Sequence, residues 1–406
     1  MRLAKTISYQ VLIAAALLLL AEGIARIAYT VHLAWAKETE WYVYAADVGW
    51  DRRPNFSDTD ECSEDRTFDE QGLVSSDGAR LKKKREGQFR VLFLGDSSTY
   101  GYCVQIEDTF VETANRLLPE VAAVNLGVNG YTSYQGYKSL LKYGPLIDPD
   151  MIFISFSFND RRLVLRPELA DSDAAFQRLY AASRLQRLSD ISYLFGAAKL
   201  ADRWLRPADS GASGTMSEVR LDRMQPRVDR QAYRENLTKM VQWAKQRGIA
   251  VAFIVLGDNP EQTRALREGI NHLSQKNHEL AIKHLTLAKD DDDAEWFSAL
   301  ASLHLAKAYE QAGLHDKARE ALSLKNVTAS VHGGSPIVLD TEYNAIVKEV
   351  ADRHGVQAID AVGELNKNAD VYVDFTHFGE TGHRIVGRLV ASALAAAMKS
   401  RPRATD

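Results

Sequence analysis

Two polar stretches far apart in the sequence hold the residue types that serine-based acyl chemistry needs. Ser97 lies in the polar cluster GDSST (95–99) that follows the apolar run at 89–94, and Asp374 stands three residues before His377 in DFTH. A serine becomes a nucleophile when a histidine within hydrogen-bond reach takes its proton and an acid orients that histidine. The three-residue spacing lets a single turn place the acid against the imidazole. We therefore treat these three residues as a candidate site for nucleophilic catalysis.

Two further positions could stabilise the negative charge that develops on an attacked carbonyl. Gly130 lies in NLGVNGYTS (125–133), and its backbone N–H can approach a substrate closely because no side chain intervenes. Asn159 lies in SFND (157–160) and offers a side-chain amide. Each also has a simpler explanation, a glycine turn and an Asn-Asp helix cap. Because ligand sites in open α/β sheets lie beyond the carboxyl ends of the strands, their common placement after strands favours catalysis.

The elements that must position these residues follow a strand-helix alternation. The run at 89–94 is apolar without a period of two, which is typical of a strand covered on both faces. Alternation of this kind predicts right-handed crossovers and a doubly wound parallel sheet. Residues 161–227 are irregular, and we expect there an insertion with some helix and a mobile loop. The expected strands are 89–94, 121–126, 151–156, 249–256 and 356–359, and the expected helices are 108–118, 133–143, 230–247, 342–353 and 380–398.

A helical insert is predicted at 261–325, and it divides the α/β domain into a first part (88–260) and a second part (326–400). HELAIKHLTLA (278–288) parallels HDKAREALSL (315–324), 37 residues further on. The second unit resembles a tetratricopeptide repeat, with Ala306, Tyr309, Gly313 and Ala318 at that family's small and aromatic positions. Because two repeats are fewer than the three or so that stack stably, we expect this pair to lean on the main domain.

The N-terminus departs from the soluble character of the rest of the chain. Arg2 and Lys5 precede an uncharged apolar stretch, Ile7 to Ala21. A cleaved signal peptide and an uncleaved signal anchor both fit this pattern, and we favour the anchor, assigned to 1–36. Positive charge before the stretch and Glu38 and Glu40 after it place the body of the protein outside the cytoplasm, in the periplasm. A polar linker or wrapping segment, 37–87, would follow.

The composition limits the possible partners. The chain has a net charge of -4 and no dense basic stripe, which argues against nucleic-acid binding. It contains two cysteines, Cys62 and Cys103. They would be inert thiols in a reducing compartment and could pair outside the cytoplasm, and their spacing leaves this open.

Taken together, the four blocks around Ser97, Gly130, Asn159 and Asp374 to His377 resemble the SGNH hydrolases, also called GDSL esterases and lipases. The resemblance covers 88–160, 228–257 and 336–398. It implies a flavodoxin-like three-layer α/β/α fold, no cofactor and no metal. It makes Ser97 the nucleophile, His377 the base and Asp374 its orienting acid. The oxyanion hole would consist of the Ser97 and Gly130 N–H groups and the Asn159 amide.

The likeness is greatest to membrane-anchored bacterial members with the pattern G-D-S-x-T-x-G, here Gly95 to Gly101. Two positions depart from the family. Ser98 replaces a common Leu, and Ser157 replaces a common Gly, which would narrow the pocket or alter a donor.

The resulting hypothesis is a serine esterase acting on acyl or acetyl esters of a small molecule, or of cell-envelope glycans or lipids. An O-acyltransferase of the same fold acting on polysaccharide is an alternative, because pocket shape and water exclusion choose the acceptor. A non-catalytic envelope scaffold that binds a protein partner through the helical repeats is another, and the complete catalytic set argues against it.

Overall fold

The computed structural model describes most of the 406-residue chain: residues 13, 16–26, 42–59, 65–73, 84–85, 87–164, 170–191, 224–291, 295–322, 337–367 and 369–399. Residues 16–26 are helical, and Leu17 to Leu20 are 60–73% exposed on this helix. Within the described ranges, no helix combines the length and the apolar character that crossing a membrane requires. The remainder of the expected anchor, 1–36, lies outside the described residues.

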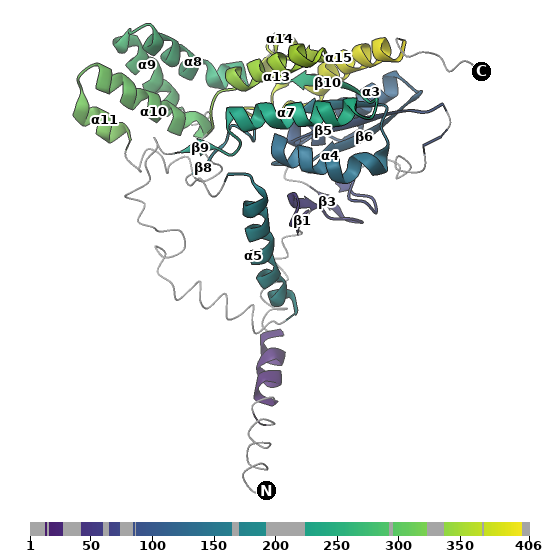
Figure 1. Ribbon diagram of the computed structural model, residues 1–406. Coiled ribbons are helices and arrows are strands. Elements are labelled where there is room, and N and C mark those ends of the chain that lie inside the picture. Colours follow the sequence, from purple (N-terminus) through teal and green to yellow (C-terminus); the bar gives the residue numbers. More distant parts are fainter. Residues whose placement is uncertain are drawn as a thin grey trace.

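A five-stranded parallel sheet forms the centre of the molecule (Figure 1). Its strands are β5 (Phe89–Gly95), β6 (Val121–Gly127), β7 (Met151–Ser155), β10 (Ala250–Val255) and β11 (Gln357–Asp360). The spatial order is β11-β10-β7-β5-β6, so the strands numbered along the chain lie in the order 2-1-3-4-5. This is the flavodoxin-like order, as predicted, and the order reverses between β5 and β7. All five strands lie within a residue or two of their predicted positions.

Helices cover both faces of the sheet. Alternate residues of β5 point to opposite sides: Leu92 and Leu94 belong to one buried cluster and Val91 and Phe93 to the other. This explains why the strand is apolar on both faces, with Arg90 as its one charged residue. The first cluster is completed by α4 (Ser133–Ile147), α7 (Arg230–Lys245) and α13 (Thr341–His354), and the second by α3 (Phe110–Leu117) and α15 (Glu380–Lys399).

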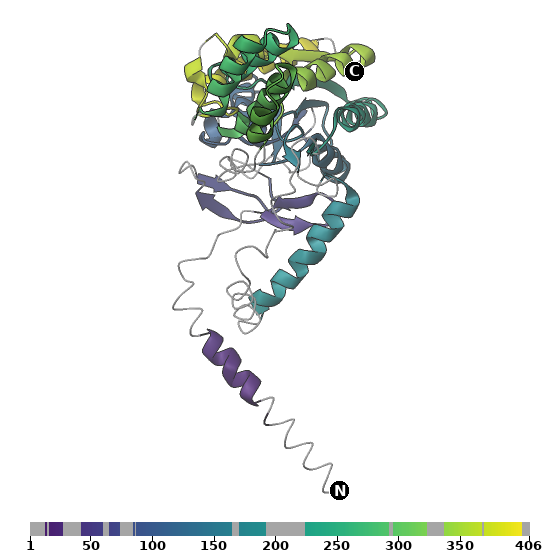
Figure 2. The same ribbon diagram turned by 90° about the vertical axis from the view of Figure 1, so that its left-hand side faces the viewer.

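The segment before the sheet forms two small antiparallel hairpins, β1 (Tyr42–Ala45) with β2 (Gly49–Arg52) and β3 (Ser57–Thr59) with β4 (Asp65–Thr67). The described residues of the expected linker or wrapping segment, 37–87, therefore include regular β structure. In the region predicted to be irregular, the described residues include the 19-residue helix α5 (Asp173–Ile191), which packs against β1 and β2 (Figure 2). The expected mobile loop lies within 192–223, outside the described residues.

The helical insert contains α8 (Pro260–Ser274), α9 (His278–Lys289), α10 (Glu295–Gln311) and α11 (His315–Ala321). Each helix packs against the next one along the chain, and together they lie at one end of the molecule (Figure 1). We call their shared hydrophobic cluster the insert core; among its members are Leu266, Leu273, Leu285, Phe297, Leu300 and Leu305. The cluster also includes Phe158 and Phe375 from the main domain, so the insert leans on that domain as expected. The tetratricopeptide likeness, and a protein partner at the insert, stay predictions.

The remaining elements are short. They are α2 (Ser97–Tyr100), η1 (Ile106–Asp108), β8 (Leu163–Val164), β9 (Gln225–Pro226), α14 (Val362–Leu365) and η7 (Ala369–Val371). The pair β8–β9 is antiparallel and lies outside the central sheet.

Candidate active site

Ser97 is the first residue of α2, separated by one residue from the end of the inner strand β5. Asp96 caps this helix, because its carboxylate accepts a hydrogen bond from the Ser98 N–H at 3.0 Å. The N–H groups of a first helical turn have no partner within the helix, so the Ser97 N–H can serve a ligand. Gly127 at the end of β6 permits this packing, since a Cβ there would lie 2.3 Å from the Tyr100 nitrogen. Ser97 is 9% exposed.

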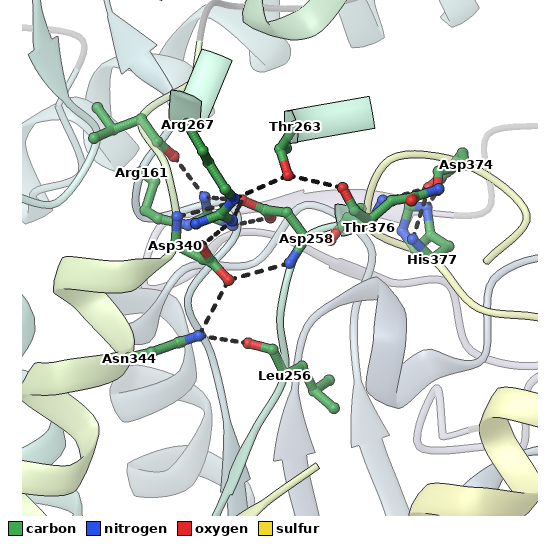
Figure 3. Close-up of polar contacts among 12 residues, drawn as sticks. Arg161, Leu256, Asp258, Thr263, Arg267, Asp340, Asn344, Asp374, Thr376 and His377 are labelled. Atoms are coloured by element: carbon green, nitrogen blue, oxygen red, sulfur yellow. Dashed lines mark hydrogen bonds and ion pairs between the residues drawn. The ribbon is translucent and has the colours of Figure 1, made fainter. Parts of the chain in front are cut away.

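Ser97, His377 and Asp374 form one continuous chain of hydrogen bonds. The His377 Nε2 atom lies 2.7 Å from Ser97 Oγ, and its Nδ1 atom lies 2.6 Å from Asp374 Oδ2. The second carboxylate oxygen of Asp374 accepts the backbone N–H groups of Thr376 at 2.8 Å and His377 at 2.6 Å. Figure 3 shows Asp374 and His377 together on the loop that precedes α15. The expected single turn places the acid against the imidazole.

The electrostatic surroundings keep this acid ionised. Burial on its own would raise the pKa of Asp374, but the hydrogen bond and charge of His377 and the two backbone N–H groups outweigh it and lower the pKa. The ring of Tyr102 packs against the imidazole, with 4.6 Å between centroids. Tyr102 thus restricts the orientation of His377 from a second side.

Gly130 lies in a tight turn after β6 that several side chains hold. Its φ of +80° is in the region that favours glycine. Arg227 donates to the Gly130 carbonyl at 2.8 Å, and the Trp50 indole donates to the Asn129 carbonyl at 3.2 Å. The guanidinium of Arg227 also lies 5.6 Å from the centre of the Trp50 ring. A residue of the N-terminal hairpin therefore forms part of the wall beside the candidate oxyanion donor.

Asn159 follows β7, on the other side of β5 from Gly130. It is 3% exposed, and its Nδ2 atom has no hydrogen-bond partner within the described part of the chain. A buried amide donor without a partner is unfavourable unless a ligand supplies the acceptor. This is the property expected of an oxyanion-hole donor.

Asp160 connects the two candidate oxyanion loops. Its carboxyl accepts hydrogen bonds from the backbone N–H of Ser133 at 2.9 Å and from the Ser133 hydroxyl at 2.6 Å. Ser133 begins α4, directly after the Gly130 turn. Burial raises the pKa of Asp160 to about 8, although the bonds from Ser133 oppose the rise. The two adjacent residues therefore have different roles. Asn159 offers an amide without a partner among the described residues, and Asp160 ties the loop after β7 to the Gly130 turn.

The two serines that depart from the family pattern line a small cavity beside the nucleophile. Its volume is about 20 Å³, and Asp96, Ser98, Ser157 and Thr376 are among its lining residues. That volume is enough for about one water molecule. The Ser157 hydroxyl is buried with no partner among the described residues. Burial raises the pKa of Asp96 to about 6, against the hydrogen bond from Ser98 and the charge of His377.

The structure brings Ser97, His377 and Asp374 into direct contact and places Gly130 and Asn159 on the two loops that flank them. Tyr102, Trp50 and Arg227 were not found from the sequence. Tyr102 is only five residues from Ser97 and could have been suspected, whereas nothing in the sequence relates Trp50 to Gly130. This constellation has a nucleophile, a base with its acid, and buried donors, which suits acyl transfer.

Cys103 also lies close to this site, directly after Tyr102, and it is disulfide-bonded. The chain has one other cysteine, Cys62, which lies outside the described residues.

Residues 93–315, more than half of the chain, match the model of the GDSL-like Lipase/Acylhydrolase family. No curated protein sequence matches the chain. Among solved structures, a lipase/acylhydrolase from Enterococcus faecalis is 15% identical, with 76% of this chain and 97% of that chain covered and a TM-score of 0.38. An acetyl xylan esterase from Geobacillus stearothermophilus is 13% identical, with 75% and 94% covered and a TM-score of 0.35. A psychrotrophic esterase from Pseudoalteromonas is 8% identical, with 77% and 99% covered and a TM-score of 0.37.

Proposed function

Because the chain belongs to the GDSL-like Lipase/Acylhydrolase family and is an acylhydrolase of that type, we propose that it cleaves carboxylic esters through Ser97, His377 and Asp374. The observation that carries the proposal is the chain of hydrogen bonds from Ser97 Oγ through both imidazole nitrogens to the Asp374 carboxylate, at 2.7 and 2.6 Å. Such a chain activates a serine at neutral pH.

The proposed reaction has two steps. In the first, His377 Nε2 takes the proton of Ser97 while Oγ attacks the carbonyl carbon of the ester. The oxyanion accepts hydrogen bonds from the N–H groups of Ser97 and Gly130 and from the Asn159 amide. His377 then returns its proton to the departing alcohol, which leaves an acyl group on Ser97. In the second step His377 takes a proton from water, whose oxygen attacks the acyl carbonyl carbon. His377 then gives this proton to Ser97 Oγ as the bond to the acyl group breaks, which releases the carboxylic acid and restores the serine.

Asp374 contributes by fixing the histidine. Its Oδ2 atom holds the proton on Nδ1, so that Nε2 has the free lone pair that must accept the serine proton. Its Oδ1 atom binds two backbone N–H groups of the same loop, so the carboxylate cannot rotate without losing them. The acid therefore sets both the protonation and the position of the base.

The proposal places this esterase outside the cytoplasm, attached to a membrane, and acting on acyl or acetyl esters of envelope glycans or lipids. Two observations support the location. Leu17 to Leu20 are exposed on the helix at 16–26, although such side chains are normally covered. Cys103 is in a disulfide, which is typical of oxidising compartments.

The test compares the full-length protein with Ser97→Ala and a matched control, Ser98→Ala. Wild type should hydrolyse short-chain aryl esters and react covalently with a fluorophosphonate. Ser97→Ala should lose the label and at least ~10³-fold in turnover. Ser98→Ala removes the neighbouring hydroxyl and should keep the label. A Ser97→Ala protein that is still labelled, or a wild type that is neither labelled nor active, contradicts the proposal.

A further inference from the structure

The insert core contains two phenylalanines that come from the loops of the active site. Phe158 directly precedes Asn159, and Phe375 lies between Asp374 and His377 in the sequence. The two rings pack on each other with 5.2 Å between centroids. Phe375 also meets the edge of Phe297 from α10, at 6.3 Å and an interplanar angle of 87°. Phe375 therefore lies between Phe158, on the loop that carries Asn159, and Phe297 of the helical insert.

Hydrogen bonds from Asn259, the residue directly before the first helix of the insert, hold the loop that carries Asp374 and His377. Asn259 is the N-cap of α8, and its side chain accepts the Glu261 N–H at 3.0 Å. Its backbone N–H donates to the Phe375 carbonyl at 2.9 Å, and its side-chain amide donates to the Asp374 carbonyl at 3.3 Å. The residue that caps the first helix of the insert therefore binds the backbone of the loop that carries Asp374 and His377 directly.

Arg161 joins the segments on both sides of the insert to the loop that carries Asn159. Arg161, two residues after Asn159, forms a bidentate pair with Asp258 at 2.9 and 2.6 Å, and both side chains are almost fully buried. Arg161 also donates to the Val338 carbonyl at 2.5 Å. Asp258 precedes the insert and Val338 follows it, and Figure 3 shows this network extending from Asp340 towards His377.

We propose that the helical insert positions the catalytic loops, with Phe375 and Phe297 as the positioning residues that transmit its packing to His377. This inference rests on the proposed function. Neither side chain is expected to touch the substrate. Their effect comes through the loop, in which His377 must stay 2.7 Å from Ser97 Oγ. A misplacement of the reacting groups by ~1 Å can cost on the order of 10² in rate, so a loosened Phe375 should slow catalysis.

Phe297→Ala tests this proposal, with Leu285→Ala as the matched control. Both side chains are 0% exposed in the insert core, on α10 and α9 respectively. Both changes should lower the Tm of the full-length protein. Only Phe297→Ala should lower kcat, by ~10-fold to 10²-fold with little change in KM, and slow fluorophosphonate labelling of Ser97 in proportion. Phe297→Leu should recover part of the loss.

A double variant provides the second measurement, because it shows whether the effects of Phe297 and Phe375 on kcat are additive. If Phe297 acts through Phe375, Phe297→Ala combined with Phe375→Ala should lower kcat no further than Phe375→Ala alone. The proposal is overturned if Phe297→Ala, or Phe297→Leu should the alanine variant not fold, leaves kcat unchanged. It is also overturned if Leu285→Ala lowers kcat equally, since the insert would then act through stability alone.

A readout that needs no esterase activity separates this proposal from the proposed function. The proton between His377 Nδ1 and Asp374, in a bond of 2.6 Å, should give a resolved downfield proton NMR signal in the wild type. Phe297→Ala should shift or broaden that signal, and Leu285→Ala should not. If the wild type hydrolyses no ester but Phe297→Ala still alters the signal, the proposed function is rejected, and the coupling between the insert and His377 stands. An unaltered signal in Phe297→Ala rejects the coupling.

Discussion

Replacing Gly130 by alanine adds one methyl group to the turn that we expect to stabilise the oxyanion. Two costs follow from the structure. At a φ of +80° an L-residue is destabilised by roughly 1–2 kcal/mol relative to glycine. The new Cβ would also lie 3.2 Å from Cζ2 of Trp50, so the ring must yield by a few tenths of an ångström. Because the Trp50 indole donates to the Asn129 carbonyl, moving the ring also displaces the turn.

Gly248→Ala separates these two costs. Gly248 has a φ of +69°, and no atom lies within 4 Å of the position its Cβ would take. It therefore carries the backbone cost without the steric contact. Loss of flexibility in the unfolded chain offsets about 0.4–1 kcal/mol of that cost in both variants. We expect Gly248→Ala to lose about 1 kcal/mol of stability or less, and Gly130→Ala to lose more.

Urea unfolding and aryl-ester kinetics measure the two effects. Gly130→Ala should lower kcat by up to ~10²–10³, the effect of removing one oxyanion donor, while Gly248→Ala leaves kcat unchanged. In a Trp50→Ala background, Gly130→Ala should cost less stability than it does in the wild type, because the contact with the ring is then absent. The reasoning is refuted if Gly130→Ala matches Gly248→Ala in stability and the wild type in kcat.

Two further predictions concern the carboxyl groups. Asp374→Asn should keep the Tm, because the amide oxygen can still accept the two loop N–H groups. It should lower kcat by ~10⁴, because the amide nitrogen faces Nδ1 and moves the imidazole proton to Nε2; a near-normal kcat argues against a catalytic acid. The pKa of Asp160 is about 8 in the folded protein and roughly 3.9 in an unfolded chain, so between these values only the unfolded state releases the proton. Stability should therefore fall as the pH rises from 4 to 8, by at most ~1.4 kcal/mol per unit. Urea unfolding of Asp160→Asn at pH 5 and 8 should show a smaller pH dependence than the wild type, and equal dependences contradict the assignment.

The local sequence was sufficient to predict the sheet. Apart from Arg90 near its start, the strand β5 is apolar on both faces up to Gly95, and the polar residues that follow it end the apolar run. The helix α3 begins two residues later than predicted, where Thr109 caps it, whereas α4 begins at Ser133 as predicted and continues four residues further, to Ile147. Some helix was expected in the segment that contains α5, but its bounds were not predicted, since its weak amphipathic pattern gives no clear period.

The candidate site was predicted in part. Ser97, Asp374 and His377 could be found because their types are chemically restricted and their neighbours in the sequence are strand ends or a turn. Trp50, Arg227 and Phe297 could not, because each acts through contacts between segments more than 75 residues apart in the chain. No pattern of residue spacing encodes such a contact, and only the packed chain shows it.

By itself the sequence determined the class of fold and the chemistry available to the protein, because hydrophobic periodicity and side-chain reactivity are local properties. The tertiary structure decided the distances that make the chemistry possible: 2.7 Å between Ser97 and His377, whose positions in the chain are 280 residues apart. It also decided that the helical insert supports the active site, since Phe375 packs against Phe158 and Phe297 only when three separate segments fold together.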